Sequence, residues 1–253
     1  MIYSESKKFL FCHVPKTGGT SITSLFSDYT SPFQQSNFSK ICRRIPFAEK
    51  TYKFYDFLNR PHTTCYKAKT LFGKKFYSLF CFAIVREPVE WLYSCFRHYK
   101  RHCYIIKGLK NIYKPTTFDE FLETIICLEP QLRPRQSLML VDSNGKLLAD
   151  SVGIFSELDQ YYSYIRDYLN LSSNSLPHQN KNNILHDNNL PFESCSYKDF
   201  VMKHWSSDYS LYELAQTTRF SSGLKNMRIY PTALSINLNK YDPWSLFAKP
   251  KIN

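Results

Sequence analysis

The sequence predicts an α/β domain of three layers, in which a central, mostly parallel sheet lies between helices. Short apolar runs of strand length alternate with longer stretches in which apolar residues recur at helical spacing. This order is typical of parallel strands joined by helices. The expected strands lie near 8–13, 79–85 and 151–155, and the expected helices near 20–29, 88–102, 117–128, 157–169 and 197–214. With 253 residues, of which 43% are hydrophobic, the chain can enclose one substantial core.

The first strand is predicted to enter a turn that binds a phosphate-like anion. Residues 13–21 read His-Val-Pro-Lys-Thr-Gly-Gly-Thr-Ser, and a helix begins at about Thr20. Its free N–H groups and the charge of Lys16 would face the anion, while Gly18 and Gly19 let the backbone approach it. The lysine precedes the glycines, unlike in a Walker A motif, so Mg²⁺-nucleotide chemistry is not implied. An ordinary turn with a solvated lysine is the alternative. Hydroxyl donors to the anion would come from Thr17, Thr20 and Ser21.

The central strand is predicted to end in a second anion-binding turn. Arg86 follows the strand directly, and Pro88 stands where a first helical residue is favoured. Ligands bind at the carboxyl ends of strands in open α/β sheets. The guanidinium of Arg86 and the hydroxyl of Ser94 would suit a phosphate there. In the alternative reading, Arg86 only pairs with a carboxylate such as Glu87 or Glu90.

The remaining elements have local start signals. Thr117 and Glu120 fit a capping box at the start of a helix, and Ser156 is a similar start before the next one. The stretches 31–62 and 174–191 have the composition of loops. Loops at the carboxyl edge of the sheet would build an acceptor pocket.

The net charge of +12 leaves two readings open. Basic clusters such as 97–102 could attract an anionic acceptor, or they could be a solvated surface. Single-stranded nucleic acid is a competing partner for a basic, aromatic chain. The aromatic residues, however, fall at the spacing of buried helix and strand faces and form no separate platform. We therefore expect no nucleic acid partner.

Cysteine spacing and hydropathy bear on metal binding and location. The eight cysteines contain no C-x-x-C pair, so no zinc site is expected. Cys12 and Cys81 fall in interior strands and are expected to be small core residues. No apolar run reaches the ~20 residues that a membrane-spanning helix needs. No signal peptide is recognised either, so we expect a cytoplasmic enzyme.

The two turns together resemble those of sulfotransferases that use 3′-phosphoadenosine 5′-phosphosulfate (PAPS). Within that superfamily the chain is similar to the carbohydrate enzymes related to heparan sulfate 2-O- and 6-O-sulfotransferases and to bacterial sulfotransferase family 2. The likeness runs in order from about residue 8 to about residue 214. It is carried by 13–21, by Val85-Arg-Glu-Pro with Ser94, and by 61–73, 117–122, 153–158 and 176–181.

The resemblance implies a P-loop-like fold and a role for each matching residue. Lys16 would bind the phosphosulfate and stabilise charge in the reaction, and the N–H groups of 18–21 would hold the 5′-phosphate. Arg86 and Ser94 would hold the 3′-phosphate, and His62 would be the catalytic base. The product would be 3′,5′-adenosine diphosphate, and no metal would be needed. The acceptor would be a hydroxyl of a carbohydrate or glycoconjugate, which can be anionic.

The chain also departs from the family pattern. Val89 and Trp91 stand where many relatives have tryptophan and arginine, and Ile154 replaces a usual arginine. Glu157 is a weaker candidate for orienting the site. Residues 215–253 match nothing, and we expect them to pack as an extension on one domain that spans the chain.

Two other functions stay open at this point. One is a phosphotransferase or kinase of the wider P-loop group, and the other is a nucleotide-binding protein without turnover. If His62 is not the base, the 31–62 loop or His178 could supply one.

Overall fold

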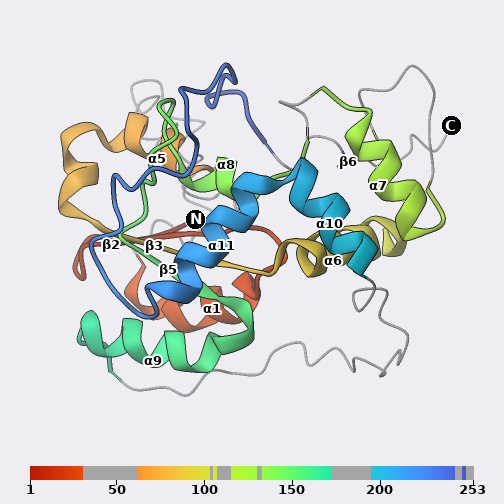
Figure 1. Cartoon of the computed structure of the whole chain (residues 1–253). Helices are drawn as coiled ribbons and strands as arrows, with labels where there is room; N and C mark the ends of the chain where they lie inside the picture. Colours follow the sequence, from red (N-terminus) through yellow and green to blue (C-terminus); the bar gives the residue numbers. More distant parts are fainter. Residues whose placement is uncertain are drawn as a thin grey trace, which may run out of the picture.

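A mostly parallel sheet of four strands forms the centre of the molecule. The structure is a computed structural model, and it describes residues 1–30, 62–102, 105–106, 115–129, 133–172, 195–242 and 247–248. The strands β1 (Ile2–Ser4), β2 (Phe9–Cys12), β3 (Phe80–Val85) and β5 (Ser151–Ile154) lie in the order β1-β2-β3-β5. β2, β3 and β5 are parallel, whereas β1 pairs antiparallel with β2 (Figure 1). The predicted sheet is confirmed, and the short edge strand β1 is an addition.

The two faces of the sheet carry side chains of different size. Phe9 and Phe11 of β2 lie on one face with Phe82 of β3, and their rings are in contact. Cys81 and Ala83 of β3 belong to the cluster on the other face. This alternation follows from the two-residue period of a strand. The second face also carries Leu10, Val85 and Val152, so both faces of the sheet are apolar and can be covered by helices.

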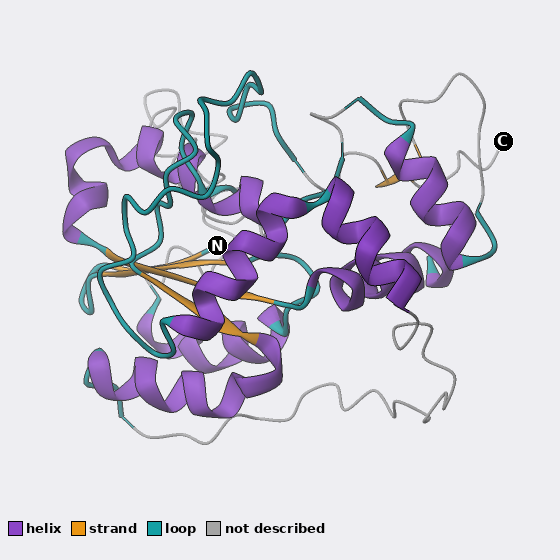
Figure 2. Ribbon diagram, in the orientation of Figure 1, coloured by secondary structure: helices purple, strands orange, loops and turns teal. Residues whose placement is uncertain are grey.

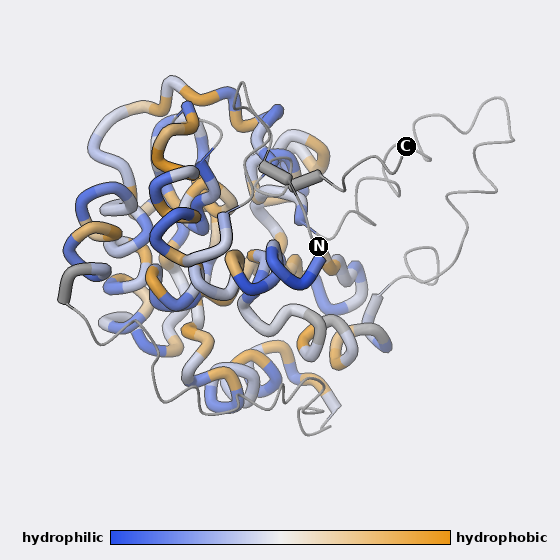
Figure 3. The backbone as a smooth tube through the Cα atoms, turned by 90° about the vertical axis from the view of Figure 1, so that its right-hand side faces the viewer, coloured by the Kyte–Doolittle hydropathy of each residue, from blue (hydrophilic) through white to orange (hydrophobic). Residues whose placement is uncertain are grey.

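Helices cover both faces of the sheet, which gives the predicted three layers (Figures 1 and 2). α1 (Gly19–Phe26) and α9 (Leu158–Tyr168) pack on the phenylalanine face. α5 (Cys65–Phe72), α8 (Ser137–Leu140) and α11 (Ser206–Thr217) lie on the other. In Figure 3 hydrophobic and hydrophilic segments alternate along the helices, as expected where one helix face is buried.

A third buried cluster lies on the side of the sheet where β3 ends (Figure 1). It joins α6 (Pro88–Arg101), α7 (Phe118–Ile126) and α10 (Cys195–His204), with Trp91 and Trp205 fully buried. Two short strands, β4 (Ile105–Ile106) and β6 (Phe247–Ala248), form a separate antiparallel pair.

Most predicted helix starts are confirmed. Pro88 is the first residue of α6, and Thr117 and Glu120 form the capping box of α7. The prediction at Ser156 is wrong, because residues 155–157 form a 3₁₀ turn and α9 starts at Leu158 without a side-chain cap. The helix predicted over 197–214 is two helices, α10 and α11, separated at Trp205. The predicted loops at 31–62 and 174–191 lie, apart from His62, outside the described residues.

The C-terminal part of the described chain contributes to the core. Leu224, Tyr230 and Tyr241 are buried in the cluster formed by α5, α8 and α11. The division of the chain into domains stays a prediction. Among the described helices, none has the length and apolar character needed to cross a bilayer.

Candidate active site

The turn between β2 and α1 is a backbone cradle. Lys16 and Gly18 have positive φ angles, 64° and 77°. Such a conformation turns successive N–H groups toward one side, where an anion can bind. Gly19 must lack a side chain, because a Cβ atom there would lie 1.7 Å from Nε2 of His13. The glycines are thus required by the backbone path and by the neighbouring imidazole.

Two groups predicted to face the anion are used inside the turn. The hydroxyl of Thr17 is fully buried and donates to the carbonyl of Val14 at 2.8 Å. The N–H of Ser21 donates to the carbonyl of Gly18 at 3.1 Å, as in a helix. The backbone of residues 18–20 is therefore the better candidate for the anion contact. The side chain of Thr20 lies outside the described part of the molecule.

Trp91 joins the second turn region to the first. Its indole N–H donates to the carbonyl of Pro15 at 2.7 Å, and the side chain is buried. This residue is one of the departures from the family pattern, and sequence analysis gave it no role. The structure shows that α6 holds the cradle through this bond.

Arg86 occupies the predicted position at the end of β3. Its Nε donates to Glu90 at 3.0 Å, so the predicted pairing with a carboxylate is confirmed. Its guanidinium also lies 4.8 Å from the ring centre of Phe155, whose edge faces Gly18. The ion pair engages Nε, and the terminal nitrogens have no partner among the described residues. Ser94 lies two turns into α6 and is half-buried.

Positive charge gathers around Lys16. Burial lowers the pKa of Lys16 first, and the cations Arg101, Arg86 and Arg97 lower it further. Arg97 and Arg101 follow Ser94 by three and seven residues on α6, so the three share one face of the helix. Mutual repulsion of these cations would be relieved by a bound anion.

Besides His13, the histidines His62 and His98 lie near Lys16. The ring centres of His62 and His13 are 4.8 Å apart. The pKa of His62 is lowered to about 4 by burial, by the N-terminal amine and by Lys16, although a hydrogen bond with the His13 backbone opposes this. The pKa of His98 is also lowered to about 4, through burial, Lys16, His102 and Arg101, with a contribution from His62. Sequence analysis missed His98, although its spacing of four residues from Ser94 places both on one helix face.

Glu157 is held by an ion pair. It accepts a hydrogen bond from Arg219, and its second carboxylate oxygen is buried without a hydrogen-bond partner among the described residues. Its predicted role in orienting the site stays a prediction. His178, the alternative base, lies outside the described residues.

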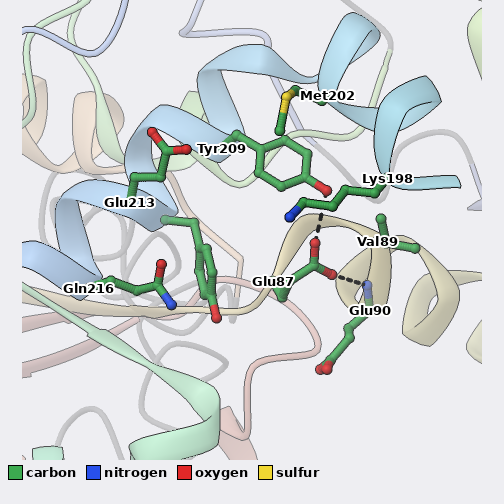
Figure 4. A pocket seen from close by; sticks show the side chains of 9 residues that line it. Glu87, Val89, Glu90, Lys198, Met202, Tyr209, Glu213 and Gln216 are labelled. Carbon is green, nitrogen blue, oxygen red and sulfur yellow. Dashed lines mark hydrogen bonds between the residues drawn. The ribbon is translucent and has the colours of Figure 1, made fainter. Parts of the chain in front are cut away.

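A cavity of about 370 Å³ lies beside the first turn of α6 (Figure 4). Glu87 caps α6 by accepting the N–H of Glu90 at 2.8 Å, and it accepts the hydroxyl of Tyr209 at 2.9 Å. The carboxylate of Glu87 therefore has a structural role at the helix N-terminus. The cavity is lined by Glu87, Val89, Glu90, Lys198, Met202, Tyr209, Tyr212, Glu213 and Gln216.

Three buried cysteine sulfurs lie beside the cradle. Cys12, which precedes the turn, forms a disulfide with Cys65 at the start of α5. The sulfur of Cys81 is 3.6 Å from that of Cys12 and 3.7 Å from that of Cys65. The expectation that Cys12 and Cys81 are small core residues is confirmed for both, but Cys12 is paired in a disulfide whereas Cys81 is a free thiol. Disulfide sulfurs offer no thiolate to a metal, so this group does not fit a metal site.

Two comparisons with known proteins bear on the family of the chain. No curated protein matches the chain in sequence. The sequence profile of the sulfotransferase family matches residues 1–215, which include both turns, His62 and most of α11. PAPS is the donor substrate inherent to that family. The likeness seen in the sequence is thereby confirmed, and the chain belongs to the sulfotransferase family.

Proposed function

We propose that the protein transfers a sulfuryl group from PAPS to a hydroxyl of a carbohydrate or glycoconjugate. The observation that carries the proposal is the convergence of Lys16, Arg86, Arg97 and Arg101 around the glycine cradle. PAPS carries anionic groups at both ends of its ribose, and the two turns offer one anion site each. Sulfuryl transfer resembles phosphoryl transfer in that it depends on positioning and charge stabilisation.

Each site residue has a proposed role. The backbone of residues 18–20 would hold the 5′-phosphate, and the charge of Lys16 would stabilise the bridging oxygen as the sulfur–oxygen bond breaks. Arg86 and Ser94 would hold the 3′-phosphate. The terminal guanidinium nitrogens of Arg86 support this, since Glu90 engages only Nε in the described structure.

His62 is the proposed base. The acceptor oxygen would bond to sulfur, the bond from sulfur to the bridging oxygen would break, and the acceptor proton would move to the imidazole. With a pKa of about 4, the free imidazole is neutral at pH 7 and can accept that proton. A bound donor would offset the charge of Lys16 and thereby raise the pKa of His62. His98 is the second imidazole in reach of the same charge.

The exposed charge of α6 supports an anionic acceptor. Arg97 and Arg101 are exposed and share a face with Ser94, next to the proposed donor site. A carboxylated or sulfated glycan could pair with them while its hydroxyl approaches the sulfur. With a neutral acceptor, Arg97 and Arg101 would have only the donor as an anionic partner.

The test compares nucleotides that differ in one group. We expect 3′,5′-adenosine diphosphate to bind with micromolar affinity and adenosine 5′-monophosphate to bind far more weakly in calorimetry. Arg86→Ala should remove ~2–4 kcal/mol from binding of the first nucleotide only, because charge-assisted hydrogen bonds are lost. Equal affinity for both nucleotides in the wild type would contradict the assignment of Arg86 and Ser94.

Metal dependence separates the proposal from the phosphotransferase alternative. Lys16 and the helix N-terminus supply the positive charge that Mg²⁺ supplies in kinases. Sulfate transfer should therefore continue in EDTA. A reaction that stops on chelation and resumes with Mg²⁺ would favour phosphoryl transfer from a nucleotide.

A further inference from the structure

Arg86 is held at the strand end by a side chain from another part of the chain. The backbone N–H of Arg86 donates to Oε1 of Gln136 at 2.9 Å, and the backbone carbonyl of Arg86 accepts from Nε2 of Gln136 at 2.8 Å. A backbone that leaves a sheet loses the hydrogen bonds of a neighbouring strand, and buried groups need replacements. The carboxamide of Gln136 replaces both bonds at once. Gln136 itself is 1% exposed, so water does not compete for them.

Gln136 is fixed in turn by a buried carboxylate. Asp208 of α11 accepts the N–H of Gln136 at 2.9 Å and the N–H of Ser137 at 3.0 Å. The hydroxyl of Ser137 also donates to it, and Asp208 is 1% exposed. Three donors on one carboxylate define the position of the backbone at 136–137. The chain of contacts therefore runs from α11 through Gln136 to the backbone of Arg86.

The guanidinium is oriented separately from the backbone. Glu90 engages its Nε, and Phe155 covers its face. Neither contact fixes where the Cα atom of Arg86 lies. A rigid Cα position is needed as well, because a displacement of about 1 Å at a binding group can cost ~100-fold.

We propose that Gln136 is a positioning residue for recognition of the 3′-phosphate, with Asp208 holding it in place. The proposal rests on the proposed function, in which Arg86 binds that phosphate. Gln136 touches neither the donor nor the acceptor in this account. It sets the place from which the arginine fork reaches the nucleotide.

The experiment measures the preference for 3′,5′-adenosine diphosphate over adenosine 5′-monophosphate by calorimetry on the full chain. Gln136→Met keeps the side-chain volume and removes both hydrogen bonds. We expect the preference to fall by ~10- to 100-fold while affinity for the monophosphate stays unchanged. In the double variant with Arg86→Ala, the two losses should not add, because both act on one interaction.

Tyr161→Phe is the matched control. It removes one buried hydrogen bond, to Ser151 on β5, without touching Arg86. Its nucleotide preference should equal that of the wild type even if its stability falls. If Gln136→Met does not fold, Gln136→Asn, whose amide is one methylene short, should show a smaller change in the same direction.

The outcomes separate the two claims. A folded Gln136 variant with the wild-type preference overturns the positioning role alone. Losses that add fully in the double variant do the same. A wild type without any preference for the 3′-phosphorylated nucleotide overturns the role of Arg86, and the role of Gln136 with it.

Discussion

The two anion-binding turns have the same architecture and different chemistry. Both follow a parallel strand and precede a helix, yet the turn after β2 offers backbone N–H groups, whereas the turn after β3 offers the side chain of Arg86. The first needs Gly19, because no side chain fits beside His13. The turn after β3 can have Pro88, which lacks a backbone N–H, at the start of α6, since an anion bound by Arg86 is not expected to need the N–H groups of that helix start.

The supports of the two turns differ in the same way. Trp91 holds the first turn at a backbone carbonyl, and Gln136 holds the second at both a carbonyl and an N–H. Each support comes from a different part of the chain. The backbone turn after β2 therefore requires room for Gly19 beside His13. The guanidinium of Arg86 instead requires that the backbone of Arg86 be held in place. Each region also brings an imidazole toward Lys16, His62 beside the first turn and His98 on α6.

Replacing the two imidazoles decides which region supplies the base. His62→Ala should lower the rate of sulfate transfer by ~10²- to 10⁴-fold, the contribution of a positioned base, and leave donor affinity nearly unchanged. His98→Ala should lower the rate of sulfate transfer less than tenfold, because His98 is expected to neighbour the base and not to accept the proton itself. Steady-state kinetics with saturating donor gives both numbers. The reverse order of effects would assign the base to α6.

Filling the first turn tests its dependence on space. Gly19→Ala should destabilise the turn by ~1–3 kcal/mol, because the new Cβ overlaps His13, and should weaken nucleotide binding accordingly. Gly223→Ala is the control: no atom lies within 4 Å of the added Cβ, although the φ of Gly223, unlike that of Gly19, is positive at 90°. It should cost ~1 kcal/mol of stability without a change in nucleotide affinity. Adding His13→Ala to Gly19→Ala should restore part of the loss.

Removing the tryptophan anchor should have an effect of similar size. Trp91→Phe keeps an aromatic ring in the core and deletes the hydrogen bond to Pro15, which leaves a buried carbonyl unsatisfied. We expect a loss of ~1–3 kcal/mol in stability, measured by urea unfolding, together with weaker binding of both nucleotides. A loss confined to the 3′-phosphorylated nucleotide would mean that Trp91 acts on the second turn instead.

Acid should weaken the fold through the histidines of the site. Burial lowers the pKa of His62 and His98 to about 4, against ~6.5 for an unfolded histidine. Between these values the unfolded chain binds protons that the folded chain does not, so stability falls as pH falls from about 6.5 toward 4. Urea unfolding at pH 7 and pH 5 measures the slope. It should be shallower in a variant with His62→Gln and His98→Gln.

The acid limb of catalysis should move when the donor binds. The pH dependence of kcat/KM reports the free enzyme, in which the pKa of His62 is about 4. The limb in kcat should lie at higher pH, because the anionic donor offsets the charge of Lys16. Coincident limbs would contradict an interaction between the donor and His62.

Local signals in the sequence predicted the elements that position the site. The apolar run before Arg86 and the proline after it placed a strand end and a helix start within a residue of where they lie. Gly18 and Gly19 likewise marked the cradle. These predictions succeed because strand length, helix caps and backbone freedom depend on neighbouring residues.

The supports could not be predicted in the same way. Gln136 is 50 residues from Arg86 along the chain, and Asp208 lies 72 residues beyond Gln136. Nothing local distinguishes a buried glutamine that bonds to a backbone from an exposed one. The disulfide between Cys12 and Cys65 was missed for the same reason, since 53 positions separate its members. Tertiary packing decides such contacts.

The disulfide also changes the covalent topology of the protein. It closes a ring that begins one residue before the cradle and ends three residues after His62. A protease cut at any single bond between residues 13 and 64 would open this ring without separating the pieces. The nicked protein would migrate as one molecule until a reductant is added, and then as two. Lys16 and His62 would thus stay in one covalently linked molecule after such a cut. In a reducing environment the disulfide would open, and the two pieces would no longer be covalently linked.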